Sequence, residues 1–507
     1  MEHTPTKFIS SYWKRLKPLW KVTFLTTALV MLCIHLPVLI GDYPNHDGLS
    51  SMYFDQNMIT SGRWFLIVAC SASSWFSVPW IIGLLSALFL GIGAVALVEF
   101  LHVEEPLLGA LIGALLAVFP ALASTFAYLF TADGYMMALM LVFLALAVTD
   151  RDPKGFLAGG VLLAFSMGIY QSYLAFAIVL ALFGVARAVI REERPGIQIL
   201  HFAGMGVIGV ALYYVILQVL LLAEGKVLDT YQGINGLAEG AQTSLLSRLM
   251  QMYTDFAAFT LRGNVLYNNV LSLIALLVLL CSMIVVLIAG GYLRKWQIPG
   301  MLLLFGLLLP PAMNMILAIS PNVTYHLLMR YQWVLLPIGV AIFGWKGAKS
   351  CRSAVSGAVQ WALFLSLLVL IGNYAVTDNI AYTNLEKKYE KTYAYCLRLA
   401  DRMEQTEGYY QGIPVAMVGV QSKDAYPETD ITGSVTSNMI GMNGDYLIYT
   451  DTNYQEFMKY YLGITIELVS DEEMERIYQT PEYQALDTFP GPNSMQVVDG
   501  ILYIKTE

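Results

Sequence analysis

The stretch VPWIIGLLSALFLGIGAVALVEF, residues 78–100, holds a single charged side chain, Glu99. A helix of about 20 apolar residues crosses the roughly 30 Å hydrocarbon core of a bilayer. Over the whole chain of 507 residues, 57% are hydrophobic and 13% are charged, and the mean hydropathy is +0.60. Soluble globular chains are less apolar than this. The sequence therefore predicts a polytopic α-helical membrane protein.

Ten further apolar runs resemble residues 78–100. The complete set of predicted spans is 22–40, 78–100, 107–124, 134–149, 156–172, 173–190, 199–222, 265–289, 299–319, 331–346 and 355–376. With a cytoplasmic N-terminus, eleven spans place fifteen Lys and Arg residues inside and five in outside loops, and nine more follow residue 378. Positive charge favours the cytoplasmic side of a membrane. We therefore predict about eleven transmembrane helices and an extracytoplasmic C-terminal segment.

The segment 378–507 is rich in Tyr, Asp and Glu and contains no apolar run of spanning length. Helical periodicity covers 383–406 and recurs near 453–462 and 471–479, whereas IPVAMVGV (413–420) predicts a buried strand. The dipeptide Asp499-Gly500 suits the tight turn of a terminal hairpin. We predict a transmembrane domain at 1–377 and an extracytoplasmic α/β domain at 378–507.

Several common catalytic motifs are missing from the sequence. It contains no CxxC, no HExxH, no P-loop and no GxGxxG before a helix, so zinc hydrolysis, ATP hydrolysis and dinucleotide chemistry lack their usual anchors. The five cysteines imply no disulfide framework. A net charge of −8 argues against nucleic-acid binding.

The acidic stretch GDYPNHDG (41–48) follows the first apolar run and places Asp42 and Asp47 where hydrocarbon meets water. Carboxylates at membrane depth are costly unless they face an aqueous cavity or a cation, which favours a functional pair. Solvated loop acids are the alternative. Further along this loop, a stripe at near-helical spacing predicts either an interfacial helix with its apolar side toward lipid or ordinary packing. The stripe consists of Leu49, Met52, Tyr53 and Ile59.

Other polar and aromatic groups fall on the same predicted external side. They are Arg63 and Trp64 in SGRW (61–64), Asp133 in FTADGY (130–135), Tyr170 and Gln171 in GIYQSY (168–173), and Arg330 and Tyr331 in LLMRYQW (327–333). The alternative role of Asp133 is that of a helix cap, and the alternative role of Tyr170 is that of an aromatic residue at the membrane interface. Arg330 suits forked hydrogen bonding to a phosphate, either of a substrate or of a lipid head group. His46 and His326 are external too, but a lone histidine is more often a polar surface residue than a ligand.

With these residues in view, the chain resembles the bacterial serotype-converting glucosyltransferases, polytopic enzymes of the GT-C class. The resemblance rests on the acidic loop followed by SGRW, the YQ pair at 170–171, the RY pair at 330–331 and the closing FPGPNSMQVVDGILYIKTE. Family members usually carry adjacent or nearly adjacent acids in the first external loop, whereas YPNH separates Asp42 from Asp47 here.

The resemblance implies transfer of glucose from undecaprenyl-phosphate glucose to a surface polysaccharide such as O-antigen, on the external face of the bacterial inner membrane. In the mechanism that we predict, Asp47 is the general base and Asp42 orients the acceptor. Arg330, with Arg63, stabilises the departing phosphate. Direct displacement predicts inversion at the anomeric carbon.

The remaining substrate-binding residues and partners follow from the same reading. Trp64 and Tyr170 would stack on the sugar, Gln171 would bond its hydroxyls, and Asp133 and Tyr331 complete the predicted substrate site. No cofactor is required, although a divalent cation held by Asp42 and Asp47 is an alternative. The implied partners are a lipid-linked glucose synthase, a flippase, membrane lipid and the polysaccharide acceptor. A lipid-linked sugar flippase or transporter, or a polysaccharide polymerase or ligase, is the rival function.

Overall fold

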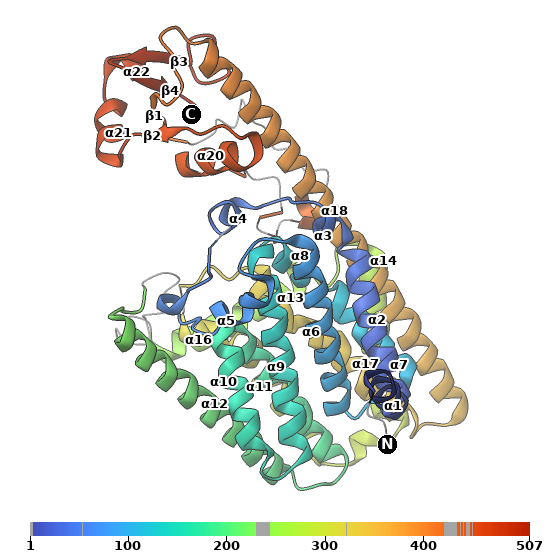
Figure 1. Ribbon diagram of the computed structural model, residues 1–507. Helices are drawn as coiled ribbons and strands as arrows, with labels where there is room; N and C mark the ends of the chain where they lie inside the picture. The colour runs from blue at the N-terminus through green and yellow to red at the C-terminus, as the bar shows by residue number, and fades with distance from the viewer. Residues whose placement is uncertain are drawn as a thin grey trace.

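The computed structural model describes residues 4–52, 54–229, 244–320, 322–419, 433–436, 438–439, 441–442, 447–448 and 450–507. Two positions of the sequence predictions fall outside these ranges, Tyr53 of the apolar stripe and the last residue of the predicted strand 413–420. Figure 1 shows a bundle of helices with a smaller, strand-containing part at one end.

Helices make up the chain as far as residue 405. In order they are α1 (Pro5–Arg15), α2 (Pro18–Ile34), α3 (Leu36–Ile40), α4 (His46–Ser50), η1 (Ile59–Ser61), α5 (Leu66–Cys70), η2 (Ser71–Ser73), α6 (Pro79–Phe100), α7 (Pro106–Val118), α8 (Pro120–Phe126), η3 (Leu129–Thr131), α9 (Ala132–Arg151), α10 (Gly155–Ile169), η4 (Gln171–Tyr173), α11 (Leu174–Ile190), α12 (Pro195–Glu224), α13 (Leu245–Arg262), α14 (Val270–Ala289), η6 (Tyr292–Arg294), α15 (Gln297–Met313), α16 (Met315–Ile319), η7 (Leu327–Val334), α17 (Leu335–Ala348) and α18 (Ser353–Gln405).

The described residues contain seven helices that are long and apolar enough to cross a membrane. The count rises to nine if the bent pairs α1–α2 and α7–α8 each form one span, and α10 and α15 are shorter apolar helices. Each of the eleven predicted apolar runs coincides with one or two of these helices. The protein is therefore a helical membrane protein, as the composition predicts.

Burial separates inner helices from outer ones. The spanning windows that contain α9 and α17 are 72% and 78% buried, whereas those of α12, α14 and α18 are each 28% buried. Exposed leucine, isoleucine and valine side chains on α12 and α14 are stable only against lipid. Small residues allow close contact within the bundle: a Cβ on Gly113 of α7 would collide with Thr27 Oγ1 of α2.

Helix α18 differs from the sequence prediction. The last predicted span, 355–376, and the predicted helix 383–406 form one continuous helix of 53 residues, and no Pro interrupts it. Residue 377 lies inside this helix, and the division of the chain at that point stays a prediction. Figure 1 shows α18 leaving the bundle and reaching the C-terminal strands.

The C-terminal part contains a four-stranded sheet of order β2-β1-β4-β3. Its elements are β1 (Pro414–Ala416), α19 (Gly433–Thr436), α20 (Asp451–Phe457), η8 (Met458–Leu462), β2 (Glu467–Leu468), α21 (Asp471–Tyr478), α22 (Pro481–Gln484), β3 (Met495–Val498) and β4 (Ile501–Ile504). Strand β1 runs parallel to β2 and β4, and β3 and β4 form an antiparallel pair. Asp499 and Gly500 both have positive φ, 50° and 77°, as a two-residue hairpin turn requires. The predicted hairpin is confirmed.

The loop that follows the first predicted span packs between these two parts. Helix α4 contacts α20, and Leu49 is buried in the same hydrophobic cluster as Tyr454 and Phe457. Met52 and Ile59 are also buried, at 6% and 5% exposure. The described residues of the apolar stripe therefore pack inside the protein, as the second of the two predictions had it. The prediction of an interfacial helix with its apolar side toward lipid is wrong for them.

Candidate active site

Asp47 lies in the first turn of α4. The side chain of Asn45 caps this helix, since its Oδ1 accepts a hydrogen bond from the Gly48 amide at 2.7 Å. The Asp47 side chain is 52% exposed. Asp133, by contrast, is fully buried. Asp47 is therefore a carboxylate that a substrate can reach.

His46 and His326 lie near Asp47, and Lys388 lies near His46. His46 is adjacent to Asp47 in sequence, whereas His326 and Lys388 come from distant parts of the chain. The Nε2 atom of His46 lies 3.5 Å from Asp47 Oδ1. Burial lowers the pKa of His46, Asp47 acts in the opposite direction, and the charge of Lys388 lowers the pKa further. Burial also lowers the pKa of His326, against the influence of Asp47 and together with that of His46. We call this group of His46, Asp47, His326 and Lys388 the Asp47 cluster.

The elements of the bundle explain how the Asp47 cluster forms. His326 comes from the loop between α16 and η7, and Lys388 comes from the part of α18 that continues past the predicted span. The Lys388 side chain is 5% exposed, although lysine is rarely buried without an interacting anion. The cluster thus combines an accessible carboxylate with one lysine and two histidines that can donate hydrogen bonds, an arrangement suited to a substrate that carries a hydroxyl and a phosphate.

A side chain from the C-terminal part of the protein holds the Asp42 carboxylate in place. The hydroxyl of Tyr461 donates a hydrogen bond to Asp42 Oδ2 at 3.1 Å. The surrounding protein desolvates the Asp42 carboxyl and raises its pKa, and the Tyr461 hydrogen bond opposes this increase. A cavity of about 10 Å³, the size for a single water, lies beside Asp42, Asn45 and Phe130.

A second group gathers the predicted residues of the SGRW and YQ motifs. Arg63 Nη1 donates to the Tyr135 hydroxyl at 3.1 Å, and its guanidinium lies over the Tyr170 ring at 5.4 Å. Tyr170 stacks on Tyr135 with ring centroids 4.2 Å apart. Gln171 Nε2 donates to the Ser61 carbonyl at 2.9 Å and to the Tyr213 hydroxyl at 3.1 Å. The two motifs therefore meet, as expected from their common predicted level.

The rings of this second group have no open face in the structure. Trp64 is 6% exposed and packs against Phe65, Phe165 and Tyr213, and a Cβ on Gly168 would lie 2.6 Å from its ring. Tyr170 is 3% exposed. The expected stacking of Trp64 and Tyr170 on a sugar is therefore corrected: packing covers both rings, and they support the loop that follows α4.

Asp133 and Tyr331 are buried side chains with structural roles. Asp133 lies in the first turn of α9, and its Oδ1 accepts from the Gly134 amide at 2.9 Å. An acid in this position favours the helix dipole, so the helix-cap alternative accounts for it. Tyr331 is fully buried, donates a hydrogen bond to the Leu116 carbonyl and stacks on Phe119. Neither side chain is open to a substrate.

Arg330 forms a buried ion pair that the sequence did not predict. Its two terminal nitrogens donate to the carboxylate oxygens of Asp255 at 2.6 and 2.8 Å. The guanidinium also lies 3.7 Å from the Tyr325 ring centroid, and Nε donates to the Tyr325 carbonyl at 3.2 Å. Tyr325 immediately precedes His326. Arg330 thus holds the loop that carries His326, and its fork is occupied by a carboxylate in place of the expected phosphate.

Sequence reasoning missed Asp255, His326, Lys388 and Tyr461 as parts of the site. Asp255 lies on α13, a segment that the topology treated as an external loop. The apolar positions of α13 recur with helical periodicity, so this signal was available in the sequence. Nothing local, however, links Lys388 or Tyr461 to the first loop. Within the described ranges, no group of three or more His, Cys, Asp or Glu side chains is arranged to hold a metal ion.

The fold defines the class, that of helical membrane proteins, and an accessible carboxylate beside basic side chains lies at one end of the bundle. The family model described as "Glucosyl transferase GtrII" matches residues 36–388. The chain belongs to this glucosyl transferase family, and membership makes it a membrane glycosyltransferase. The match includes every residue of the Asp47 cluster and ends at Lys388, so the closing segment of the resemblance lies beyond it. No curated protein and no solved structure matches the chain.

Proposed function

We propose that the protein transfers glucose from undecaprenyl-phosphate glucose to a cell-surface polysaccharide on the external face of the bacterial inner membrane. Family membership supports the transfer of glucose. The observation that carries the mechanism is the Asp47 cluster, in which one accessible carboxylate lies beside His46 and His326, with Lys388 next to His46. The fold that we propose is GT-C-like, with eleven spans in residues 1–377 and an extracytoplasmic α/β domain in 378–507.

In the proposed reaction, Asp47 accepts the proton of the acceptor hydroxyl while that oxygen attacks the anomeric carbon of glucose. The bond from this carbon to the lipid phosphate breaks, and its electron pair leaves with the phosphate. Lys388 and His326 then stabilise the phosphate, which gains negative charge in the transition state. This assignment replaces Arg330 as the direct phosphate ligand, because Asp255 already occupies its guanidinium.

Two features support this function over its rivals. A flippase or transporter would carry its polar residues along a path through the bundle, whereas the Asp47 cluster gathers at one end, beside the C-terminal part. A polymerase or ligase would use the same kind of lipid phosphate. The family assignment separates these enzymes from the proposed glucosyltransferase.

The direct test is transfer by the purified protein. We expect label to pass from radiolabelled undecaprenyl-phosphate glucose to surface polysaccharide from the native host, and the product to have the anomeric configuration opposite to that of the donor. Nuclear magnetic resonance of the product measures this configuration. Retention would exclude direct displacement. Movement of the intact donor across vesicles, without transfer, would favour the flippase.

Tyr461→Phe is expected to move the acid limb of the activity profile to higher pH. Loss of the hydroxyl removes a hydrogen bond that lowers the pKa of Asp42, so that pKa rises further. Asp42 would then become protonated, and lose its charge for orienting the acceptor, at a higher pH than in the wild type. Initial rates between pH 4 and 8 measure the change. Tyr460→Phe is the matched control, and an unchanged acid limb in Tyr461→Phe would remove Asp42 from the mechanism.

A further inference from the structure

A pocket of about 260 Å³ lies at the end of the bundle opposite the Asp47 cluster. It is formed where the last turns of α11 and α17 meet α14 and the residue that follows α6. Arg187 lies near the end of α11, whereas Tyr170 and Gln171 precede its first residue, so about 20 Å of helix separates the pocket from the second group of the active site. The pocket is therefore independent of the proposed transfer reaction.

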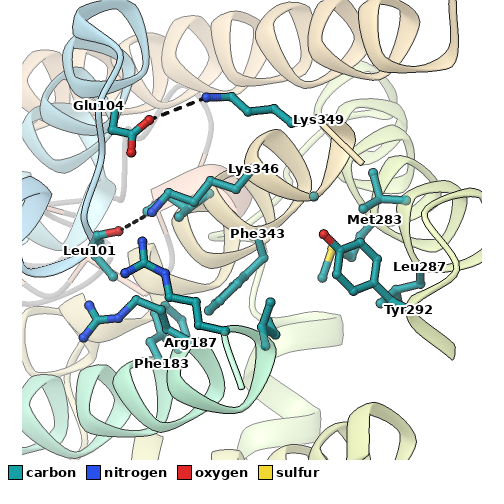
Figure 2. Close-up of a pocket in the computed structure, with 15 residues that line it drawn as sticks. Leu101, Glu104, Phe183, Arg187, Met283, Leu287, Tyr292, Phe343, Lys346 and Lys349 are labelled. Carbon is teal, nitrogen blue, oxygen red and sulfur yellow. Dashed lines mark hydrogen bonds and ion pairs between the residues drawn. The ribbon is translucent and has the colours of Figure 1, made fainter. Parts of the chain in front are cut away.

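One wall of the pocket is cationic and the other is apolar. Figure 2 shows Arg187 and Lys346 directing their cationic groups to the same side, near Leu101, and Met283, Leu287 and Tyr292 across from them. Four cations line the pocket, Arg187, Arg191, Lys346 and Lys349, with Glu104 as its one lining carboxylate.

The four cations of this wall differ in whether a nearby carboxylate already balances their charge. Arg187 pairs with Asp150, and Lys349 lies 3.1 Å from Glu105 and 3.7 Å from Glu104. Arg191 lies 3.1 Å from His102 Nδ1 and 3.9 Å from Glu193. Lys346 donates to the Leu101 carbonyl at 2.8 Å and forms no ion pair within the described parts of the chain.

Lys346 is half-buried and, unlike the three cations beside it, has no carboxylate partner among the described residues, which is costly unless an anion balances its charge. A ligand of this pocket therefore carries negative charge at the level of Lys346. The apolar wall favours a ligand whose uncharged part is hydrophobic. Met283 and Leu287 belong to α14, on which Ile284 and Ile288 are 53% and 65% exposed, so one wall of the pocket is a helix that also faces hydrocarbon.

We infer that the pocket binds the phosphate of an anionic phospholipid of the bilayer, with Lys346 and Arg191 at the phosphate and an acyl chain along α14. A volume of about 260 Å³ is smaller than the 300–1,000 Å³ typical of sites that enclose a whole ligand. It suits a head group and the start of a chain, while the remaining chain lies along the lipid-facing helix. The positive charge also matches the cytoplasmic orientation predicted for this end of the bundle.

The test uses the full-length protein purified in a neutral detergent. Dioleoyl phosphatidylglycerol, dioleoyl phosphatidylcholine and undecaprenyl phosphate are titrated separately, and bound lipid is counted by native mass spectrometry alongside the melting temperature. We expect phosphatidylglycerol to bind and to raise the melting temperature, and phosphatidylcholine to do neither. Lys346→Gln should weaken phosphatidylglycerol binding about tenfold or more, because it removes a charge-assisted hydrogen bond.

Lys295→Gln is the matched control, since Lys295 lies at the same end, pairs with Glu192 and does not line the pocket. Met283→Trp provides a second test that keeps Lys346 and fills the apolar wall, and it should also weaken binding. Equal losses in Lys346→Gln and Lys295→Gln would overturn the site. So would equal binding of phosphatidylglycerol and phosphatidylcholine. Lys346-dependent binding of undecaprenyl phosphate in place of phosphatidylglycerol would overturn the choice of ligand.

Discussion

Asp47→Asn is expected to lower the rate of glucose transfer by a factor of about 10² to 10⁴ while the protein remains folded. The asparagine amide keeps the size of the side chain but cannot accept the proton of the acceptor hydroxyl. Because the Asp47 side chain is half exposed, the amide that replaces the carboxylate stays in contact with solvent and is not a buried polar group. Initial rates with labelled donor measure the effect, and the loss should appear in kcat more than in KM.

Asp55→Asn is the matched control for this substitution. Asp55 belongs to the same loop and is exposed, and its Oδ1 accepts only from the Asn57 amide in the hydrogen bonds described. We expect near wild-type transfer from it. Wild-type transfer by Asp47→Asn would show that another group is the base, and Asp42→Asn would then identify or exclude the other acid of the loop.

Arg330→Gln is expected to destabilise the protein by about 3–5 kcal/mol, because it leaves the Asp255 carboxylate without its cation. The pair is bidentate, and the Arg330 and Asp255 side chains are 9% and 25% exposed. Asp255→Asn should have an effect of similar size. The double variant Arg330→Gln with Asp255→Asn should recover much of the loss, since no unpaired charge remains. Melting temperatures in detergent measure all three.

Transfer by the same variants separates a positioning role of Arg330 from direct binding of phosphate. Arg330 also donates to the Tyr325 carbonyl, next to His326 of the Asp47 cluster. A positioning role predicts that every variant without Arg330 loses transfer through kcat, with KM for the donor unchanged, and that Asp255→Asn, which releases the guanidinium, also loses transfer. Direct phosphate binding predicts that every variant without Arg330 has low activity, including the double variant, and that KM for the donor increases.

The eleven apolar runs all correspond to helices, because long hydrophobic stretches and helical periodicity are local properties of a chain. The turn at Asp499-Gly500 was predictable for the same reason, since only residues tolerant of positive φ suit it. The predicted span 355–376 and the predicted helix 383–406 join in one helix, because the composition changes between them while the backbone continues as helix. Hydropathy describes what surrounds a helix and does not indicate where the helix ends.

By itself, the sequence determined that the protein is embedded in a membrane, that Asp42 and Asp47 lie at the end of the first span, and which family it resembles. Only the tertiary structure decided which side chains meet. Tyr461 reaches Asp42 across 419 positions of sequence, and Lys388 joins His46 because α18 extends beyond its apolar part. Arg330 likewise meets Asp255, 75 positions away, on a helix that hydropathy did not reveal. Such contacts depend on how helices pack and on the direction of each side chain, and neither is a local property of the chain.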